Sequence, residues 1–395
     1  MESSNASQVV IVGGGGTGGA LAHDLALRGL RVVLVERHGL TSGTTGRHHG
    51  LLHSGARYAV NDAASAAECI RENRILRRIC PGSFELNDGL FVALTEEDMD
   101  YRERFMPACE TSGIPVRWLT PAEALRLEPG LNPTLLGAAQ VPDGTMDAMR
   151  LPLRFFATAL ANGAAIHPYT ELTGLNGTTS CVTGVRVLDR MTGRAYAIGA
   201  DLVVNAAGPW GGKIGRMAGV EVPVRPSPGV LVAMRGRHSE MVVSRLHASS
   251  DGDIVVPQRG LSIIGTSSWL GEDPDDLGVP EEHVRRMLTE GARLLPSLRG
   301  SEMRAAWSAA RPLVGDRGGG TGRELSRTFK CFDHAVDDGV EGFVTISGGK
   351  GTTLRGMAEL TADVVCRKLG IDAPCRTAET VLLPHTAFHR VPVAA

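Results

Sequence analysis

The sequence predicts an α/β protein of two lobes, in which a discontinuous and mostly parallel sheet is joined to a second α+β lobe built on a mixed sheet. An apolar run at residues 9–12 is followed by small and apolar residues at near-helical spacing and by a second apolar run at 32–35, a pattern typical of a βαβ unit. Two further apolar runs, at 201–205 and 342–346, are typical of strands buried in a parallel sheet. Residues 222–332 instead carry short strand-like runs separated by turns. The first lobe is therefore expected to be assembled from segments that are distant in sequence.

The remaining elements complete the two lobes. Helices are expected near residues 62–78, 96–111, 149–161, 281–294 and 352–369. Shorter strands are expected at residues 90–94, 116–119, 137–141, 182–188, 195–198, 229–233, 241–244, 253–257 and 261–265. We assign residues 1–80, 145–221 and 334–395 to the first lobe, and residues 81–144 and 222–333 to the second. Residues 316–322, DRGGGTG, are expected to form a mobile loop.

The composition of the 395 residues excludes several classes of protein. There are 41 Lys and Arg against 43 Asp and Glu, so no overall basic field favours nucleic acid or an anionic membrane surface. The 7 cysteines form no C-x-x-C pair, which argues against a disulfide framework, and no metal site is expected. The N-terminal segment lacks the features of a signal peptide, and no apolar run reaches the roughly 18–20 residues of a membrane span. We expect a cytoplasmic protein, with peripheral contact at the inner membrane face left open.

A glycine-rich turn joins the first strand to the first helix. Gly13, Gly15 and Gly18 form G-x-G-x-x-G at this point, where close backbone approach lets a pyrophosphate lie at the helix N-terminus. Glu36 ends the second strand, where a carboxylate can accept hydrogen bonds from ribose hydroxyls. The alternative is a glycine-rich helix start that only packs closely. Because an acidic residue here disfavours a 2′-phosphate, FAD and NAD are the candidate ligands.

Longer segments resemble a known family. They are TGRHHGLLHSGARYAVND, DGTMDAMRL, VVNAAGPWGGKI, PSPGVLV, SDGDIVVPQRGLSIIGTSS, AARPLVGD, LSRTFK and ISGGKGTTLRGMAE, and they are spread over almost the whole chain. Together they resemble the FAD-dependent oxidoreductase family that includes D-amino acid oxidase and glycerol-3-phosphate dehydrogenase, most closely the large-subunit branch of the bacterial anaerobic glycerol-3-phosphate dehydrogenases. Two features depart from that pattern. The family usually has Asn where this sequence has His48, and its large subunits continue into a cysteine-rich electron-transfer region that is not found before Ala395.

The resemblance implies that the first lobe is a Rossmann-like domain that binds FAD noncovalently. The cofactor-binding residues that it implies are Gly13, Gly15, Gly16, Thr17, Gly18, Glu36, Arg37, Thr44, Thr45, Gly46, His49, Gly50, Leu51, Ala207, Gly208, Gly349, Lys350, Gly351 and Thr352. The amides that open the last helix can then face the flavin and stabilise negative charge on the reduced ring. A plain helix cap is the alternative at that position.

The resemblance also implies a substrate side made of histidines and cations. His53 is implied as the base for a hydroxyl proton, and a histidine suits this role because its ordinary pKa lies near neutrality. The alternative is a structural histidine that orders its loop. The implied catalytic residues are His53, His49, Lys350 and Arg311, and the implied substrate-binding residues are Arg57, Tyr58, Arg311, Arg327 and Lys350. An arginine fork suits an anionic substrate because it can hold two phosphate or carboxylate oxygens at once.

The implied reaction is oxidation of a small anionic secondary alcohol, sn-glycerol 3-phosphate to dihydroxyacetone phosphate in the first instance, by hydride transfer to flavin N5. One rival is an oxidase or dehydrogenase of a 2-hydroxy acid or an amino acid, whose carboxylate the same arginines can bind. Another is a flavin-bearing protein that serves assembly or electron relay and is inactive alone. Electrons are expected to pass to a quinone, to oxygen or to a partner protein, and not to NAD, because no second G-x-G-x-x-G follows a strand.

Overall fold

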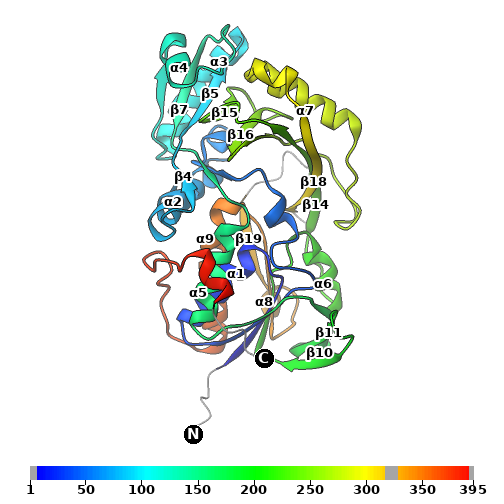
Figure 1. The fold of residues 1–395 in the computed structure, drawn as a ribbon. Helices are drawn as coiled ribbons and strands as arrows, with labels where there is room; N and C mark the ends of the chain where they lie inside the picture. The colour runs from blue at the N-terminus through cyan, green and yellow to red at the C-terminus, as the bar shows by residue number, and fades with distance from the viewer. Residues whose placement is uncertain (1–6, 316–327, 391–395) are drawn as a thin grey trace.

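The computed structural model describes residues 7–315 and 328–390, and it has two lobes that lie one above the other in Figure 1. A six-stranded sheet forms the centre of the first lobe, and an eight-stranded sheet forms the centre of the second. The loop expected at 316–322 and the predicted site residue Arg327 lie outside the described residues. In the part of the chain that is described, no helix combines the length and the apolar character needed to cross a membrane.

The six-stranded sheet is parallel except at one edge. Its strands follow the order β19 (Phe329–Asp333), β20 (Phe343–Gly348), β13 (Leu202–Asn205), β1 (Gln8–Val12), β2 (Arg31–Val35) and β9 (Ala165–His167). β19 runs antiparallel to β20, and every other neighbouring pair is parallel. The sheet thus joins the beginning, middle and end of the chain, as the separated apolar runs predicted.

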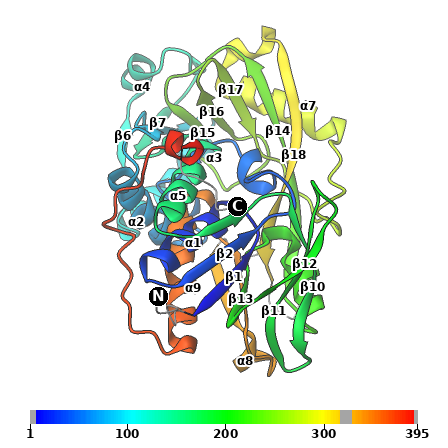
Figure 2. The same ribbon diagram turned by 60° about the horizontal axis from the view of Figure 1, so that its bottom comes forward.

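Alternating side chains of β1 contribute to a different core on each face of this sheet. Val9 and Ile11 pack among helices α1 (Gly16–Leu27), α5 (Arg150–Ala161) and α9 (Leu354–Leu369). Val10 and Val12 pack on the opposite face, against a three-stranded sheet of β10 (Thr170–Thr178), β11 (Cys181–Asp189) and β12 (Ala195–Gly199). Figure 2 shows the three layers, with β1 and β2 between the helices and β10–β12.

The eight-stranded sheet of the second lobe is mixed. Its strands follow the order β18 (Met303–Val314), β14 (Val224–Arg235), β17 (Leu261–Gly265), β16 (Ile254–Gln258), β15 (Val242–Arg245), β5 (Gly89–Ala93), β7 (Gly137–Val141) and β6 (Arg117–Leu119). Only the β15–β5 pair is parallel. Helices α4 (Pro121–Leu127) and α7 (Glu281–Leu294) contribute to the core on one face, and α2 (Ala63–Ile79) and α3 (Glu96–Thr111) to a core on the other.

Several short elements complete the described chain. They are η1 (Thr44–Arg47), β3 (Leu51–Leu52), η2 (Ala56–Tyr58), β4 (Phe84–Glu85), β8 (Gly144–Met146), η3 (Gly208–Trp210), α6 (Gly211–Met217) and η5 (Gly351–Thr353). A buried ion pair fastens two of the larger helices near them: the Arg355 guanidinium in α9 donates to both carboxylate oxygens of Glu72 in α2, at 2.8 and 2.7 Å. Each charge is thereby compensated where water is excluded.

Most predicted helices and strands are found within about two residues of their expected bounds. Strands β3, β4, β8, β9, β10 and β19 and helices α4, α6 and α8 (His334–Asp337) were not predicted. β18 was not predicted, because its AASAA centre lacks clear alternation and its conformation depends on pairing with β14 along nearly its whole length. β14 itself is longer than the strand expected at 229–233. Residues 329–333 were expected in the second lobe, whereas the pairing of β19 with β20 places them in the first.

The buried His23 in α1 should make the protein sensitive to acid. Burial lowers its pKa from 6.5 to about 4, and neither ring nitrogen has a hydrogen-bond partner among the described residues. As pH falls below 6.5 the unfolded chain takes up a proton at this residue and the folded chain does not, so stability is lost until about pH 4. We expect protonation linked to His23 alone to lower the free energy of unfolding by about 2 kcal/mol between pH 7 and pH 5.

Urea unfolding of the wild type and of His23→Leu at both pH values measures this contribution. On acidification, the free energy of unfolding should fall by about 2 kcal/mol less in the variant than in the wild type. His389→Leu, at an exposed histidine, is the control and should keep the wild-type dependence. Equal losses in the wild type and His23→Leu would contradict the assignment.

Candidate functional site

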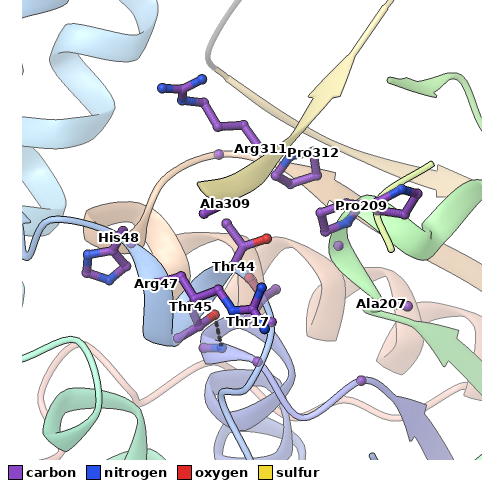
Figure 3. A pocket seen from close by; sticks show the side chains of 18 of the residues that line it. Thr17, Thr44, Thr45, Arg47, His48, Ala207, Pro209, Ala309, Arg311 and Pro312 are labelled. Atoms are coloured by element: carbon purple, nitrogen blue, oxygen red, sulfur yellow. Dashed lines mark hydrogen bonds between the residues drawn. The ribbon is translucent and has the colours of Figure 1, made fainter. Parts of the chain in front are cut away.

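A cavity of about 980 Å³ is lined by residues of both lobes, a volume at the upper end of the range for small-molecule sites. Figure 3 shows its walls: Arg311 and Pro312 come from β18, Thr44 and Thr45 from η1, and Pro209 from η3. η1 is fastened to β18, because the Thr44 hydroxyl donates to the Ala310 carbonyl at 2.6 Å. The two lobes therefore build one site.

The glycine-rich turn forms one end of the cavity. Gly13 has φ +115°, and an added Cβ there would lie 2.6 Å from the carbonyl oxygen of Ala206 in the turn after β13. α1 begins beside the cavity with no side-chain cap and no acidic residue in its first turn. The Gly16 amide donates to the Thr45 hydroxyl at 3.0 Å. An N-terminus of this kind, with its positive dipole end toward the cavity, suits a pyrophosphate.

Glu36 lies at the same end, directly after β2. Its carboxylate accepts from the amides of Gly14 at 2.8 Å and His38 at 2.9 Å. These two bonds hold the carboxylate beside the glycine-rich turn, where it lines the cavity. A carboxylate at this place can also accept from the hydroxyls of a ribose.

Two adjacent histidines after η1 line the cavity in the neutral state. Nδ1 of His48 accepts from the Gly50 amide at 2.9 Å, and Nδ1 of His49 accepts from the Leu51 amide at 3.3 Å. The proton of each neutral ring is therefore on Nε2. Burial lowers the pKa of His48 to about 4; burial, followed by nearby positive groups, lowers the pKa of His49 to about 3.

His53 lines the cavity at the next position along this loop. Its backbone is fixed, because the His53 amide donates to the Thr352 hydroxyl at 3.0 Å and its carbonyl accepts from the Asn73 side chain at 3.0 Å. Its ring nitrogens make no hydrogen bond to any described residue, so they are available to a ligand. Burial, with neighbouring His49 and Lys350, lowers the pKa of His53 well below its ordinary value. The imidazole is therefore neutral near pH 7.

Cationic side chains surround these rings. The Arg57 guanidinium donates to the buried Asp253 carboxylate at 2.6 Å, and the Lys350 ammonium lies 4.6 Å from the centre of the Tyr58 ring. Arg311 donates to the Ser267 carbonyl at 3.0 Å and to the Thr266 hydroxyl. Cationic side chains and neutral histidines thus line one cavity, which suits an anionic ligand that must also lose a proton.

The cavity brings together most of the predicted site residues. Those that line it are Gly13, Gly15, Gly16, Thr17, Glu36, Arg37, Thr44, Thr45, His49, Leu51, His53, Arg57, Tyr58, Ala207, Gly208, Arg311, Gly349, Lys350 and Gly351. Their convergence is an observed fact about the fold; their individual roles remain predictions.

Four predicted cofactor residues are not among the lining residues: Gly18, Gly46, Gly50 and Thr352. Gly18 is required by packing, since an added Cβ would lie 2.0 Å from the Gly13 carbonyl oxygen. Gly50 has φ +81°, and an added Cβ would lie 2.5 Å from the Met146 carbonyl oxygen. Gly18 and Gly50 are thus required by the close packing of backbone beside the cavity.

Sequence reasoning missed several residues around the cavity. Asp253, which holds Arg57, was given no role. Lys213, Pro274 and Asp275, which line the cavity, were given none either. Asp253 lies in one of the segments that resemble the family, and this was the only feature of the sequence that could have indicated a role for it. Nothing in the sequence around Asp275 indicated that it contacts the other lobe.

Comparison with known proteins agrees with the geometry. The family model described as FAD dependent oxidoreductase matches residues 8–364. The chain is 46% identical to the A subunit of the anaerobic glycerol-3-phosphate dehydrogenase of Escherichia coli (strain K12), over 96% of this chain and 70% of that protein. It is 44% identical to the A1 subunit of the anaerobic glycerol-3-phosphate dehydrogenase of Haloferax volcanii, over 95% of this chain and 66% of that protein.

A solved structure has the same fold. The glycerol-3-phosphate dehydrogenase from Bacillus halodurans, complexed with FAD, superposes with a TM-score of 0.74 and 26% sequence identity. The match covers 98% of this chain and 71% of that one.

Proposed function

This chain belongs to the family of FAD-dependent oxidoreductases, and on that premise we propose that it oxidises sn-glycerol 3-phosphate to dihydroxyacetone phosphate with FAD as its cofactor. The observation that carries the proposal is one cavity lined by Arg57, Arg311 and Lys350 together with a neutral His53. The relatives named glycerol-3-phosphate dehydrogenase support the choice of substrate. In this proposal, the first lobe, with residues 329–333 added to it, is the cofactor-binding domain, and the second lobe is the substrate-binding domain.

The residues at the glycine-rich end fit FAD. The close approach of Gly13 to Ala206 leaves no room for side chains there, and the uncapped start of α1 offers amides to a pyrophosphate. Glu36 would hold the ribose, and Gly349 and Gly351 would lie beside the flavin. No cysteine is among the described residues that line the cavity, so attachment of the flavin through a cysteine is not expected. When bound, FAD supplies the two-electron oxidant for the alcohol carbon.

The cations would bind and orient the phosphate. Arg57 reaches the cavity with its guanidinium held by Asp253, so part of its rotational freedom is lost before substrate binds. Arg311 is held in a similar way by the Ser267 carbonyl and the Thr266 hydroxyl. Groups fixed in this way place the alcohol carbon more accurately than mobile side chains would.

His53 would take the hydroxyl proton. Its ring nitrogens are available to a ligand, and its lowered pKa keeps the ring neutral before substrate arrives. The positive groups around it contribute to that lowering, so the negative charge of a bound phosphate opposes part of the effect. Substrate binding thus raises the basicity of the group that must accept the proton.

We also propose that the chain works with further protein subunits, because the names of its relatives describe them as the A or A1 component of a larger enzyme. The electron acceptor is then a quinone, oxygen or a partner protein. The cavity residues assigned above bind substrate and cofactor in either case.

Anaerobic bleaching of the flavin tests the reaction directly. We expect sn-glycerol 3-phosphate alone to remove the flavin absorbance of the purified protein, whereas glycerol, without the anion, should not. Bleaching by 2-hydroxy acids or amino acids and not by the phosphate would favour a carboxylate substrate. No bleaching by any of these compounds would favour a relay protein.

Arg311→Ala should raise the KM for the phosphorylated substrate at least about thirtyfold, corresponding to about 2 kcal/mol for loss of a desolvated charged contact. Arg311→Lys should recover only part of this, because an ammonium lacks the arginine fork. Arg304→Ala, on the exposed part of the same strand, is the matched control. A wild-type KM in Arg311→Ala would remove Arg311 from the substrate site.

Glu36→Arg should raise the Kd for FAD by roughly tenfold to a hundredfold, since hydrogen bonds to a charged group contribute about 1.5–3 kcal/mol. Flavin absorbance per chain after desalting, together with FAD titration of the apoprotein, measures this change. Glu97→Arg makes the same charge reversal on the exposed surface of α3 and should retain FAD. Full flavin content in Glu36→Arg would contradict the ribose assignment.

A further inference from the structure

The segment that connects β17 to α7 crosses from the second lobe to the first. Its first half extends along β14: the Trp269 amide donates to the Pro228 carbonyl at 3.2 Å, and the Gly271 amide donates to the Pro226 carbonyl at 3.0 Å. Beyond Gly271 the segment leaves the sheet, and Pro274, Asp275 and Leu277 line the cavity. Figure 1 shows this segment in yellow-green, descending from the level of α7 toward α6.

The Asp275 carboxylate receives hydrogen bonds from three separate elements of the first lobe. One oxygen accepts from the Arg37 guanidinium, directly after β2, at 2.5 Å and from the Trp210 indole in η3 at 2.8 Å. The other oxygen accepts from the Lys213 ammonium in α6 at 2.8 Å. Asp273 strengthens the arrangement by accepting from the same ammonium at 2.8 Å and from the Asp275 amide at 2.9 Å.

These contacts lie at the end of the cavity that holds Glu36. Arg37 follows Glu36 in sequence, and Trp210 follows the turn that contains Ala207 and Gly208. The Arg37 guanidinium lies 4.8 Å from the centre of the Trp210 ring, so Asp275 holds both partners of a cation–π contact. One carboxylate therefore fixes two side chains that line the cavity where a nucleotide would bind.

We propose that Asp275 is a positioning residue for the cofactor. Its carboxylate holds Arg37 and Trp210 in place as a wall of the nucleotide end of the cavity, and the segment that carries it closes this end over bound FAD. Release of FAD then requires the contacts of Asp275 to break. The inference rests on the FAD-binding family and on these contacts, and it does not depend on which substrate is oxidised.

FAD release from the holoprotein tests the proposal without substrate. After dilution into buffer, Asp275→Asn should release FAD, detected by its fluorescence, about tenfold faster than the wild type. Salt should accelerate release from the wild type more than from the variant, because the side chains of Asp275 and Arg37 are 42% and 31% exposed and their attraction is screened. Asp276→Asn removes the same charge from the adjacent exposed position and should release FAD at the wild-type rate.

Thermal unfolding separates this role from a merely structural one. If Asp275 acts on the cofactor, Asp275→Asn should lower the Tm of the holoprotein more than that of the apoprotein, because the stabilisation by bound FAD is reduced. Equal lowering of the two Tm values would overturn the proposal. So would a wild-type release rate in Asp275→Asn, or equally fast release from Asp276→Asn.

Discussion

The close packing of backbone around Gly13 is the constraint on which the site depends. The carbonyl oxygen of Gly13 lies against the α carbon of Gly18, and the α carbon of Gly13 lies against the carbonyl oxygen of Ala206. Neither glycine therefore has room for a Cβ. This packing brings the start of α1 and the turn after β13 together at the end of the sheet. Glu36 is then held through Gly14, and Thr45 through Gly16. Two close contacts of backbone with backbone thus set the positions of the groups around them.

Burial disfavours the charged form of both kinds of basic residue in the cavity, but the outcome differs. Histidines lose their charge when water is excluded, and the lowered pKa values of His48, His49 and His53 follow mainly from that cost. An arginine cannot lose its proton, so Arg57 keeps its charge and is stabilised by Asp253. The cavity therefore holds charged guanidinium groups beside neutral imidazole rings, although all these residues are basic.

Local patterns predicted the part of the fold that local sequence determines. The β1–α1–β2 unit, its glycines and Glu36 are close together in sequence and have a characteristic spacing. The long β18 and the interlobe contacts of Asp253 and Asp275 depend on residues far away in the chain, so spacing carried no signal for them. The substrate side was predicted from family resemblance alone, because single histidines and arginines have no local pattern that separates a site residue from a surface one.

Gly229 connects the missed strand pairing to the chemistry of the site. It lies opposite Ala309 in the antiparallel pair of β14 and β18. An added Cβ on Gly229 would lie 2.8 Å from an Arg311 nitrogen and 2.3 Å from the Ser267 carbonyl oxygen. The Arg311 guanidinium thus lies against the α carbon of Gly229, and any larger residue at position 229 would displace the guanidinium. The same small residue lets Ser267 accept from Arg311 and lets the arginine reach the cavity. The strand pairing that sequence alone did not predict is therefore what places this cation beside the histidines.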